Sequence, residues 1–240
     1  MLRSAKEILG YTIRATDDDL GRVHDFYFDD WTWTIRYLVV DTGKWLPDRQ
    51  VLIAPEATGD PDWGQRVLPV QLTRELVEGA PSIDLARPVS REYEAKLADY
   101  YGWMPYWGPA AGVPPRMEQL ERAQPSEPEE GTHLRSVREV TGYQIHAADE
   151  DVGHVEDFIT DTDGWFIRYV VVDTRNWLPG RKVLVSPAWV TRVNWADKKL
   201  WVGLTRDAIE HSPEFDPGAP VNREYEARLY DYYGRPKYWE

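Results

Sequence analysis

The chain has 240 residues, no cysteine and a formal charge of −13 at pH 7. The lack of cysteine excludes disulfides, thiolate metal ligands and a cysteine nucleophile, and it is in keeping with a reducing compartment. The acidic balance lacks the positive potential that nucleic-acid binding needs, and no apolar run approaches the roughly 20 residues that span a bilayer. We therefore expect a cytoplasmic protein that binds no nucleic acid and does not insert directly into a membrane.

Two long stretches of the chain are copies of one another. Residues 2–107 align with residues 134–239 at a constant offset of 132 without a gap, so LRSAKEILGY corresponds to LRSVREVTGY. The period is far longer than a solenoid repeat, and each copy is therefore expected to be a domain of its own. The predicted organisation is a first domain at 1–107, a Pro/Ala/Glu-rich linker at 108–133 with a short helical turn at 116–122, and a second domain at 134–240.

The first two-thirds of each copy predict strands. In the first copy these are residues 10–13, 21–25, 35–41 and 51–55, in that order. Residues 35–41 are rich in β-branched and aromatic side chains, which is typical of a buried strand. Gly, Pro and Asp cluster between the segments and indicate turns. The second copy repeats the pattern, and short strands at this spacing favour a small barrel.

Where a further hairpin is expected, the two copies differ. Residues 190–204 of the second copy predict two strands about the turn Ala196-Asp-Lys-Lys. The first copy carries Asp60-Pro61-Asp62 in the corresponding place. Proline donates no ladder hydrogen bond, so we expect this arm of the hairpin to be frayed or at an edge.

The last third of each copy predicts a short helix and a longer one. Thr73 and Ser90 can cap the two helices of the first copy, and the longer helix runs from Arg91 to a stop at Gly102. The second copy repeats these signals at Thr205, Asn222 and Gly234.

Four stretches, found twice in the same order, resemble the PRC-barrel family. They lie within LGYTIRATDDDLGRVHDFYFDD and IRYLVVDTGKWLPDRQVLIAP and within their counterparts in the second copy. The family is named for the cytoplasmic part of the photosynthetic reaction-centre H subunit, and a similar barrel ends the ribosome maturation factor RimM. The resemblance implies a mainly β fold with helical tails (α+β): two tandem small PRC-type β-barrels, each followed by a short and a longer C-terminal helix, in a pseudo-twofold arrangement.

Since such domains are mostly adaptors, the resemblance implies a non-catalytic scaffold that mediates protein–protein interaction and carries no cofactor. Its partner would be a protein, membrane-associated or not, and the two repeats would pair with each other; a homo-oligomer is left open. One alternative is an H-subunit-like accessory that influences photosynthetic electron transfer at a membrane complex. The other is an enzyme or small-ligand site in a cleft between the barrels.

The aromatic residues are the most informative part of the composition. The chain holds 12 Trp and 14 Tyr but only 5 Phe, and Trp and Tyr are enriched at protein interfaces. The tails of the two copies could pack on their own barrel, on the other copy or on another subunit. The predicted interaction surface comprises two loop tips and two tails: Trp45, Leu46, Pro47, Trp177, Leu178, Pro179, Trp103, Trp107, Tyr238 and Trp239.

A set of charged residues recurs in both copies: Asp25, Arg36, Asp41, Arg49, Asp157, Arg168, Asp173 and Arg181. As an enzyme site, Asp41 would be a general base and Arg36 an anion clamp. As a structural set, the charges would pair across neighbouring strands and fix their register. No Ser-His-Asp set, phosphate-binding glycine loop or dinucleotide fingerprint accompanies them, so we predict the structural role and no enzyme.

The acidic stretches Asp17-Asp18-Asp19, Asp29-Asp30 and Asp161-Thr162-Asp163-Gly164 could each bind a cation. The last begins like a calcium loop, but Trp165 and Val172 occupy the fifth and twelfth positions, where a true loop needs ligands. Asp and Gly also favour β-turns, and the sequence therefore predicts solvated turns without a metal. The five histidines show no pair with the spacing of metal ligands on a helix.

Overall fold

A computed structural model describes residues 1–47, 49–83, 88–107, 133–174 and 181–240. The helical turn predicted at 116–122 lies outside these residues. The described residues form two compact units, and each unit takes pieces from both repeats. One unit joins residues 7–107, which we call the first body, to residues 133–138, the second leading segment. The other joins residues 139–240, the second body, to residues 1–6, the first leading segment.

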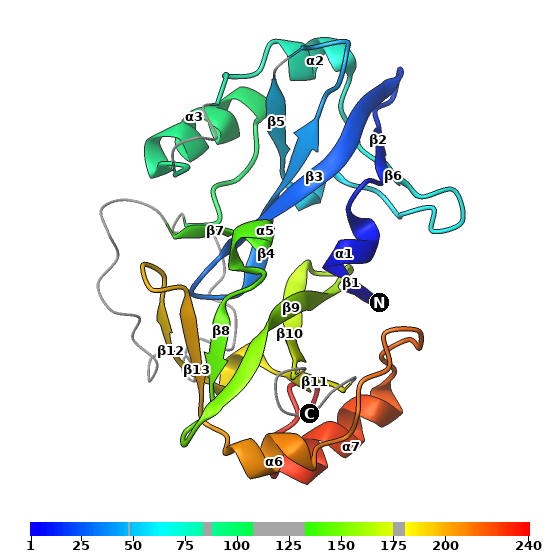
Figure 1. Ribbon diagram of the computed structural model, residues 1–240. Helices are drawn as coiled ribbons and strands as arrows, with labels where there is room; N and C mark the ends of the chain where they lie inside the picture. The colour runs from blue at the N-terminus through cyan, green and yellow to red at the C-terminus, as the bar shows by residue number, and fades with distance from the viewer. Residues whose placement is uncertain (48, 84–87, 108–132, 175–180) are drawn as a thin grey trace. The chain divides into compact units, whose positions relative to one another are not determined.

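The first body is built on a sheet in the order β5–β4–β3–β2–β6, and β7 of the second leading segment also pairs with β3 (Figure 1). β2 and β6 are parallel, and the other neighbours are antiparallel. The strands are β2 (Thr12–Arg14), β3 (Asp19–Asp29), β4 (Thr34–Asp41), β5 (Gln50–Ile53), β6 (Val67–Pro69) and β7 (Leu134–Ser136).

The second body repeats this sheet in the order β11–β10–β9–β8–β13–β12, with β1 of the first leading segment on β9 (Figure 1). β8 and β13 form the parallel pair. The strands are β1 (Leu2–Ser4), β8 (Gln144–His146), β9 (Asp151–Asp161), β10 (Phe166–Asp173), β11 (Lys182–Val185), β12 (Val190–Asn194) and β13 (Lys199–Val202).

The predicted difference between the hairpins of the two copies is confirmed. In the second body, β12 and β13 form an antiparallel pair. In the first body the corresponding arm makes only isolated bridges, from Thr58 to Val70 and from Asp62 to Val67. A short 3-10 helix precedes this arm in each body: η1 (Pro55–Ala57) and η2 (Pro187–Trp189).

One glycine in each body allows two strands to approach closely. Gly21 has φ +146, and a Cβ atom there would lie 2.0 Å from the carbonyl oxygen of Asp41. Gly153 has φ +125, and a Cβ atom there would lie 2.0 Å from the carbonyl oxygen of Asp173. Because no side chain fits at either position, these glycines are requirements of the sheet.

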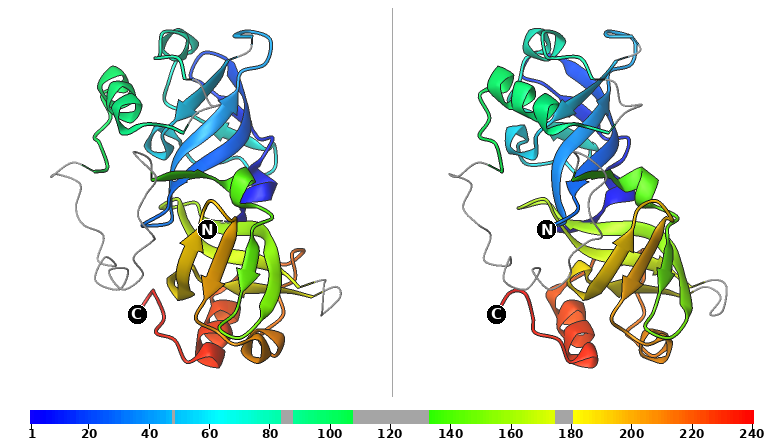
Figure 2. Two further views of the ribbon diagram at one scale, coloured as in Figure 1. Left: turned by 60° about the vertical axis from the view of Figure 1, so that its left-hand side comes forward. Right: turned by 90° about the vertical axis from the view of Figure 1, so that its left-hand side faces the viewer.

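The predicted helices are present with their predicted caps. The hydroxyl of Thr73 accepts from the amide of Leu76 at the start of α2, and Gly102 ends α3 in the left-handed conformation. Figure 2 shows α6 beside α7 in both of its views, and the Tyr232 hydroxyl donates to the carbonyl oxygen of Ala208. The helices are α1 (Ala5–Ile8), α2 (Arg74–Glu78), α3 (Arg91–Tyr101), α5 (Val137–Val140), α6 (Arg206–Glu210) and α7 (Arg223–Tyr233).

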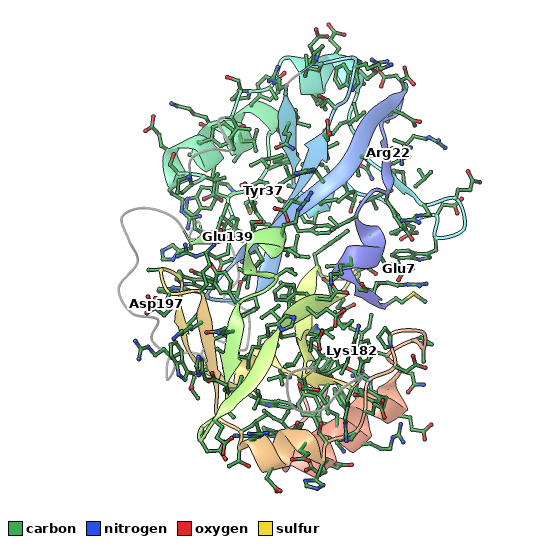
Figure 3. All side chains as sticks on the ribbon, in the orientation of Figure 1. Glu7, Arg22, Tyr37, Glu139, Lys182 and Asp197 are labelled. Carbon is green, nitrogen blue, oxygen red and sulfur yellow. The ribbon has the colours of Figure 1, made fainter. Side chains whose placement is uncertain are left out.

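The longer helix of the first body is held on the sheet by apolar packing. Leu97 of α3 shares a buried cluster with Tyr37 and Val39 of β4 and Leu52 of β5. Figure 3 labels Tyr37, the largest of these side chains on β4. Leu134 of the second leading segment belongs to the same cluster, so a residue of the second repeat completes the core of the first body.

Candidate interaction surface

Each leading segment is bound by a buried aspartate on the long strand of the receiving body. The Ser4 hydroxyl donates to one carboxylate oxygen of Asp157, and the Lys6 amide donates to the other at 3.1 Å. In the other unit, Ser136 and the amide of Arg138 bind Asp25 in the same way. The register is also the same, since Ser4 lies opposite Ile159 and Ser136 lies opposite Tyr27.

Burial raises the pKa of both Asp25 and Asp157, because each carboxyl lies away from water. The donated hydrogen bonds from Ser136 and Ser4, and from backbone amides, act in the opposite direction and favour the carboxylate. Asp25 is only 6% exposed. A buried carboxylate needs donors, so each body depends on the leading segment that supplies them.

Around this shared centre, the two leading segments make different ion pairs. The N-terminal ammonium of Met1 lies 3.1 Å from Asp161 and 2.9 Å from Asp163. In the other unit, Arg135 lies 3.0 Å from Asp30. The two leading segments are therefore bound by the same hydrogen bonds at their centre, and the ion pairs around that centre differ between the two units.

Arg36 and Arg168 form ion pairs, but their partners are not among the aspartates of the predicted set. Arg36 lies 3.7 Å from Asp29, and Arg168 lies 3.2 Å from Asp161, in each case across neighbouring strands. Asp29 and Asp161 were absent from the predicted set of paired charges, although both occur at the same position of the repeat. Comparing the copies for every shared acidic residue would have found them.

Two further recurring arginines bind the carbonyl ends of the short helices. The Arg49 guanidinium donates to the carbonyl oxygens of Glu78, at 2.8 Å, and Ala80, at the end of α2. The Arg181 guanidinium donates to the carbonyl oxygen of Ser212, after α6. A cation at this end of a helix meets the unpaired carbonyls and the negative end of the dipole.

The last pair of recurring aspartates lies at the ends of β4 and β10. The Asp41 carboxylate accepts a hydrogen bond from the Gly43 amide at 2.9 Å and so closes a turn. Asp173 is buried, and its carboxylate lies 3.8 Å from Nε2 of His154. Arg36, which the alternative enzyme interpretation made an anion clamp, pairs with Asp29.

The aromatic tail of the first copy packs on its own body. The Tyr106 hydroxyl donates to the buried Glu94 carboxylate at 2.7 Å, and the Arg36 guanidinium lies 3.9 Å from the Tyr106 ring centroid. Burial raises the pKa of Glu94, and the hydrogen bond from Tyr106 acts against that rise. Trp103 stacks on Tyr101 with ring centroids 4.2 Å apart.

The second tail repeats this arrangement. The Tyr238 hydroxyl donates to Glu226 at 2.8 Å, and the Tyr169 hydroxyl donates to the same oxygen at 2.7 Å. The Arg168 guanidinium lies 4.3 Å from the Tyr238 ring centroid. Trp107 and Trp239, which were both in the predicted interaction surface, each pack against an arginine of the longer helix. Arg91 of α3 lies over the Trp107 ring, and Arg223 of α7 lies over the Trp239 ring.

The loop tip of the first copy also faces its own body. The indole nitrogen of Trp45 donates to the carbonyl oxygen of Leu20, and the Arg74 guanidinium lies 4.5 Å from the ring centroid. Leu46 is half-buried and Pro47 is exposed. The corresponding tip of the second copy, Trp177, Leu178 and Pro179, lies outside the described residues.

The acidic turns hold the short helices in place. The Asp17 carboxylate accepts from the amide of Arg74 at 3.0 Å, and the Arg74 guanidinium pairs with Asp18. Asp149 and Glu150 bind Arg206 in the same way in the second body. Across the described ranges, no group of three or more His, Asp or Glu side chains is placed to hold a metal ion.

Large apolar side chains with substantial exposure are concentrated on the first body. Trp31 is 52% exposed and Met104 is 65% exposed, and Leu76 and Tyr100 also reach solvent. In the second copy the positions of Trp31, Leu76 and Met104 hold Asp163, Ala208 and Pro236. None of these four residues was in the predicted interaction surface, which was drawn from the loop tips and from the ends of the tails.

These contacts define a duplicated β-rich protein whose two units are completed by exchanged strands. The model of the PRC-barrel domain matches residues 2–68 and 133–205, which together make up more than half of the chain. The chain therefore belongs to the PRC-barrel domain family, in two tandem copies. No curated protein matches the chain. Among the described helices, none combines the length and apolar character needed to cross a bilayer.

Proposed function

We propose that the chain is a non-catalytic PRC-barrel adaptor that binds a protein partner through the first body. The observation that carries this proposal is the difference between the copies at exposed positions. Trp31, Leu76 and Met104 are apolar and solvent-exposed, whereas their counterparts are small or polar. Tryptophan and methionine are both enriched at protein interfaces.

The structural use of the recurring polar residues supports a non-catalytic role. Asp25 and Asp157 bind the leading segments, Arg49 binds helix carbonyls, and Arg36 pairs with Asp29. Each of these side chains stabilises the fold through a contact with the chain itself. A general base or an anion clamp would need a polar group directed at a substrate.

The proposal includes two further features. The two copies form barrels in a pseudo-twofold arrangement, which is supported by the identical register of the two leading segments. The protein acts in the cytoplasm, which is supported by the lack of cysteine.

The test compares capture of partners by variants of the intact chain. Immobilised wild-type chain, a Trp31→Ser/Leu76→Ala variant and a matched Tyr232→Ala variant are each incubated with native lysate, and bound proteins are quantified by mass spectrometry. We expect a defined partner to bind the wild type and Tyr232→Ala equally and to fall by about tenfold on Trp31→Ser/Leu76→Ala, as for the loss of an interface anchor. Equal capture by all three proteins would refute the proposed surface. Circular dichroism spectra establish that the variants are folded.

A further inference from the structure

The two leading segments are chemically interchangeable at their centre. Both contain Leu-Arg-Ser, at Leu2–Ser4 and at Leu134–Ser136, and both form strands of the same length. Each serine donates to an aspartate at the same position of the receiving body, and each strand pairs in the same register. Both bodies therefore bind the Leu-Arg-Ser segment through the same hydrogen bonds and the same register.

A body without a leading segment has an incomplete core and an open sheet. Asp25 would lose the hydroxyl donor of Ser136 and the amide donor of Arg138, and would keep the amide of Phe26. Val137, which is 3% exposed, would leave its buried place. A strand edge without its partner and a carboxylate that has lost two of its three donors both favour the binding of a replacement segment.

Charge also favours a segment of this same protein. The leading segments contain no acidic residue, although the chain has a formal charge of −13. Their charged side chains are Arg3 and Lys6 in one segment and Arg135 and Arg138 in the other. Lys6 lies 3.9 Å from Glu156, and Arg135 lies 3.0 Å from Asp30. Opposite charges on segment and body attract the segment before it pairs.

We propose that these sites also accept the leading segment of a second copy of the chain, so that the protein self-associates by mutual strand exchange. The inference rests on the geometry of the segments and is independent of the proposed adaptor function. The occupant is a second copy because it carries the sequence, the register and the basic charge that the site already binds. The exchange replaces each contact within a chain by the same contact between chains, and its equilibrium is set by protein concentration.

The packing of one residue selects which segment enters which body. Ala5, which is fully buried, and Val137 occupy equivalent positions of the two segments. Placing Ala5 in the first body would leave a cavity, and placing Val137 in the second body would overpack it. The exchanged dimer therefore keeps the first leading segment with a second body, and the second leading segment with a first body.

The lack of cysteine allows a direct test with single-cysteine variants of the full chain. Arg3 and Thr160 are Cα partners across β1 and β9, within the range that a disulfide can bridge. One chain carries Arg3→Cys and the other carries Thr160→Cys, so a disulfide between these positions can form only between two chains. The two variants are unfolded, mixed, refolded together at increasing concentration and oxidised, and the products are separated by non-reducing electrophoresis.

We expect a covalent dimer whose fraction rises with protein concentration. Adding Asp157→Ala to the Thr160→Cys chain should lower that fraction by about tenfold, because the segment loses two hydrogen bonds to a buried carboxylate. Replacing the Thr160→Cys chain by a Phe28→Cys chain, which places the cysteine at the equivalent position of the first body, should also lower it. An Arg3→Cys/Thr160→Cys chain at low concentration supplies the geometric control, since it should form the disulfide within one chain. Formation of that internal disulfide without any dimer in the mixture would overturn the proposal.

Discussion

At three exposed positions the first repeat carries large apolar side chains, and the second repeat carries small or polar ones. These positions are Trp31, Leu76 and Met104, against Asp163, Ala208 and Pro236. The positions that hold the fold together show the opposite pattern. The aspartates that bind the leading segments and the glutamates that bind the tails have equivalent partners in both repeats.

This difference between the exposed and the buried positions shows which residues can change without disturbing the fold. A substitution at Asp25 or Glu94 disturbs a buried carboxylate and the strands or tail bound to it, whereas Trp31 is half exposed on a turn and its ring meets the His133 ring edge-to-face. The two repeats therefore agree on framework and differ on surface. Experiments that alter one repeat at a time measure this division directly.

The largest expected effect is at the glycines, where the two repeats should respond equally. Gly21→Ala and Gly153→Ala each place a methyl group 2.0 Å from a backbone carbonyl oxygen, and we expect each to lower the free energy of unfolding by about 3 kcal/mol or more. Gly43→Ala is the control, because Gly43 also has a positive φ but no atom lies within 4 Å of its Cβ position; we expect a loss of about 1 kcal/mol. Chemical denaturation measures all three. A large difference between Gly21→Ala and Gly153→Ala would break the structural equivalence of the repeats.

A smaller effect on stability is expected at the equivalent positions where the two leading segments differ, Ala5 and Val137, and there the two substitutions change the packing in opposite directions. Val137→Ala removes two buried methyl groups and should destabilise the chain by about 2 kcal/mol through a cavity. Ala5→Val adds the same groups to a fully buried position and should destabilise it by about 1–3 kcal/mol through overpacking. Thermal and chemical unfolding of the two variants provides the measurement. Neutral effects from both would show that the receiving bodies do not discriminate between the segments.

The contact between Tyr106 of the first tail and the buried Glu94 should give a pH-dependent effect on stability on the order of 1 kcal/mol, the size of a hydrogen bond. Burial raises the pKa of Glu94 above its ordinary value of 4.5, so the folded chain holds a proton there at pH values where the unfolded chain does not. This contribution to stability is full below pH 4.5 and is lost as the pH rises through the raised pKa. Glu94→Gln cannot take up the proton, and its stability relative to the wild type should therefore improve as the pH rises. Unfolding curves of both proteins between weakly acidic and neutral pH test the sign; a constant difference would contradict it.

The smallest effect on stability is expected at the exposed surface. Trp31→Ser should change the free energy of unfolding by less than about 0.5 kcal/mol, since the side chain is half exposed and lies on a turn. Partner binding should nevertheless weaken. A strongly destabilised variant would assign Trp31 to the framework rather than to the surface.

The sequence was sufficient for the elements and the family. The β-branched run of Ile35–Asp41 lies in β4, and the signals at Ser90 and Gly102 bound α3 as predicted. The frayed arm at Asp60–Asp62 followed from the chemistry of proline. These features depend on residues close together in the sequence, whose physical preferences act locally.

The exchange of the leading segments could not be read from the sequence. Leu2–Ser4 and Leu134–Ser136 are identical, and so are the aspartates that receive them, so either segment satisfies either body by the same hydrogen bonds. The sequence left the packing of the tails open for the same reason. The carboxylates Glu94 and Glu226, to which the tails bind, went unnoticed because a glutamate on an amphipathic helix ordinarily faces water.

Ser4 and Asp157 are 153 residues apart in the sequence, and Ser136 and Asp25 are 111 apart. During synthesis the first body emerges complete but for the strand that covers β3, and the ribosome must add the second leading segment before that core can close. The first leading segment waits longer, since Asp157, which binds it, follows Ser4 by 153 residues. Closure of the first body therefore waits for residues 133–138, and a nascent chain halted before residue 133 should leave the part of β3 that pairs with β7, Tyr27–Asp29, more open to hydrogen exchange than the rest of the strand.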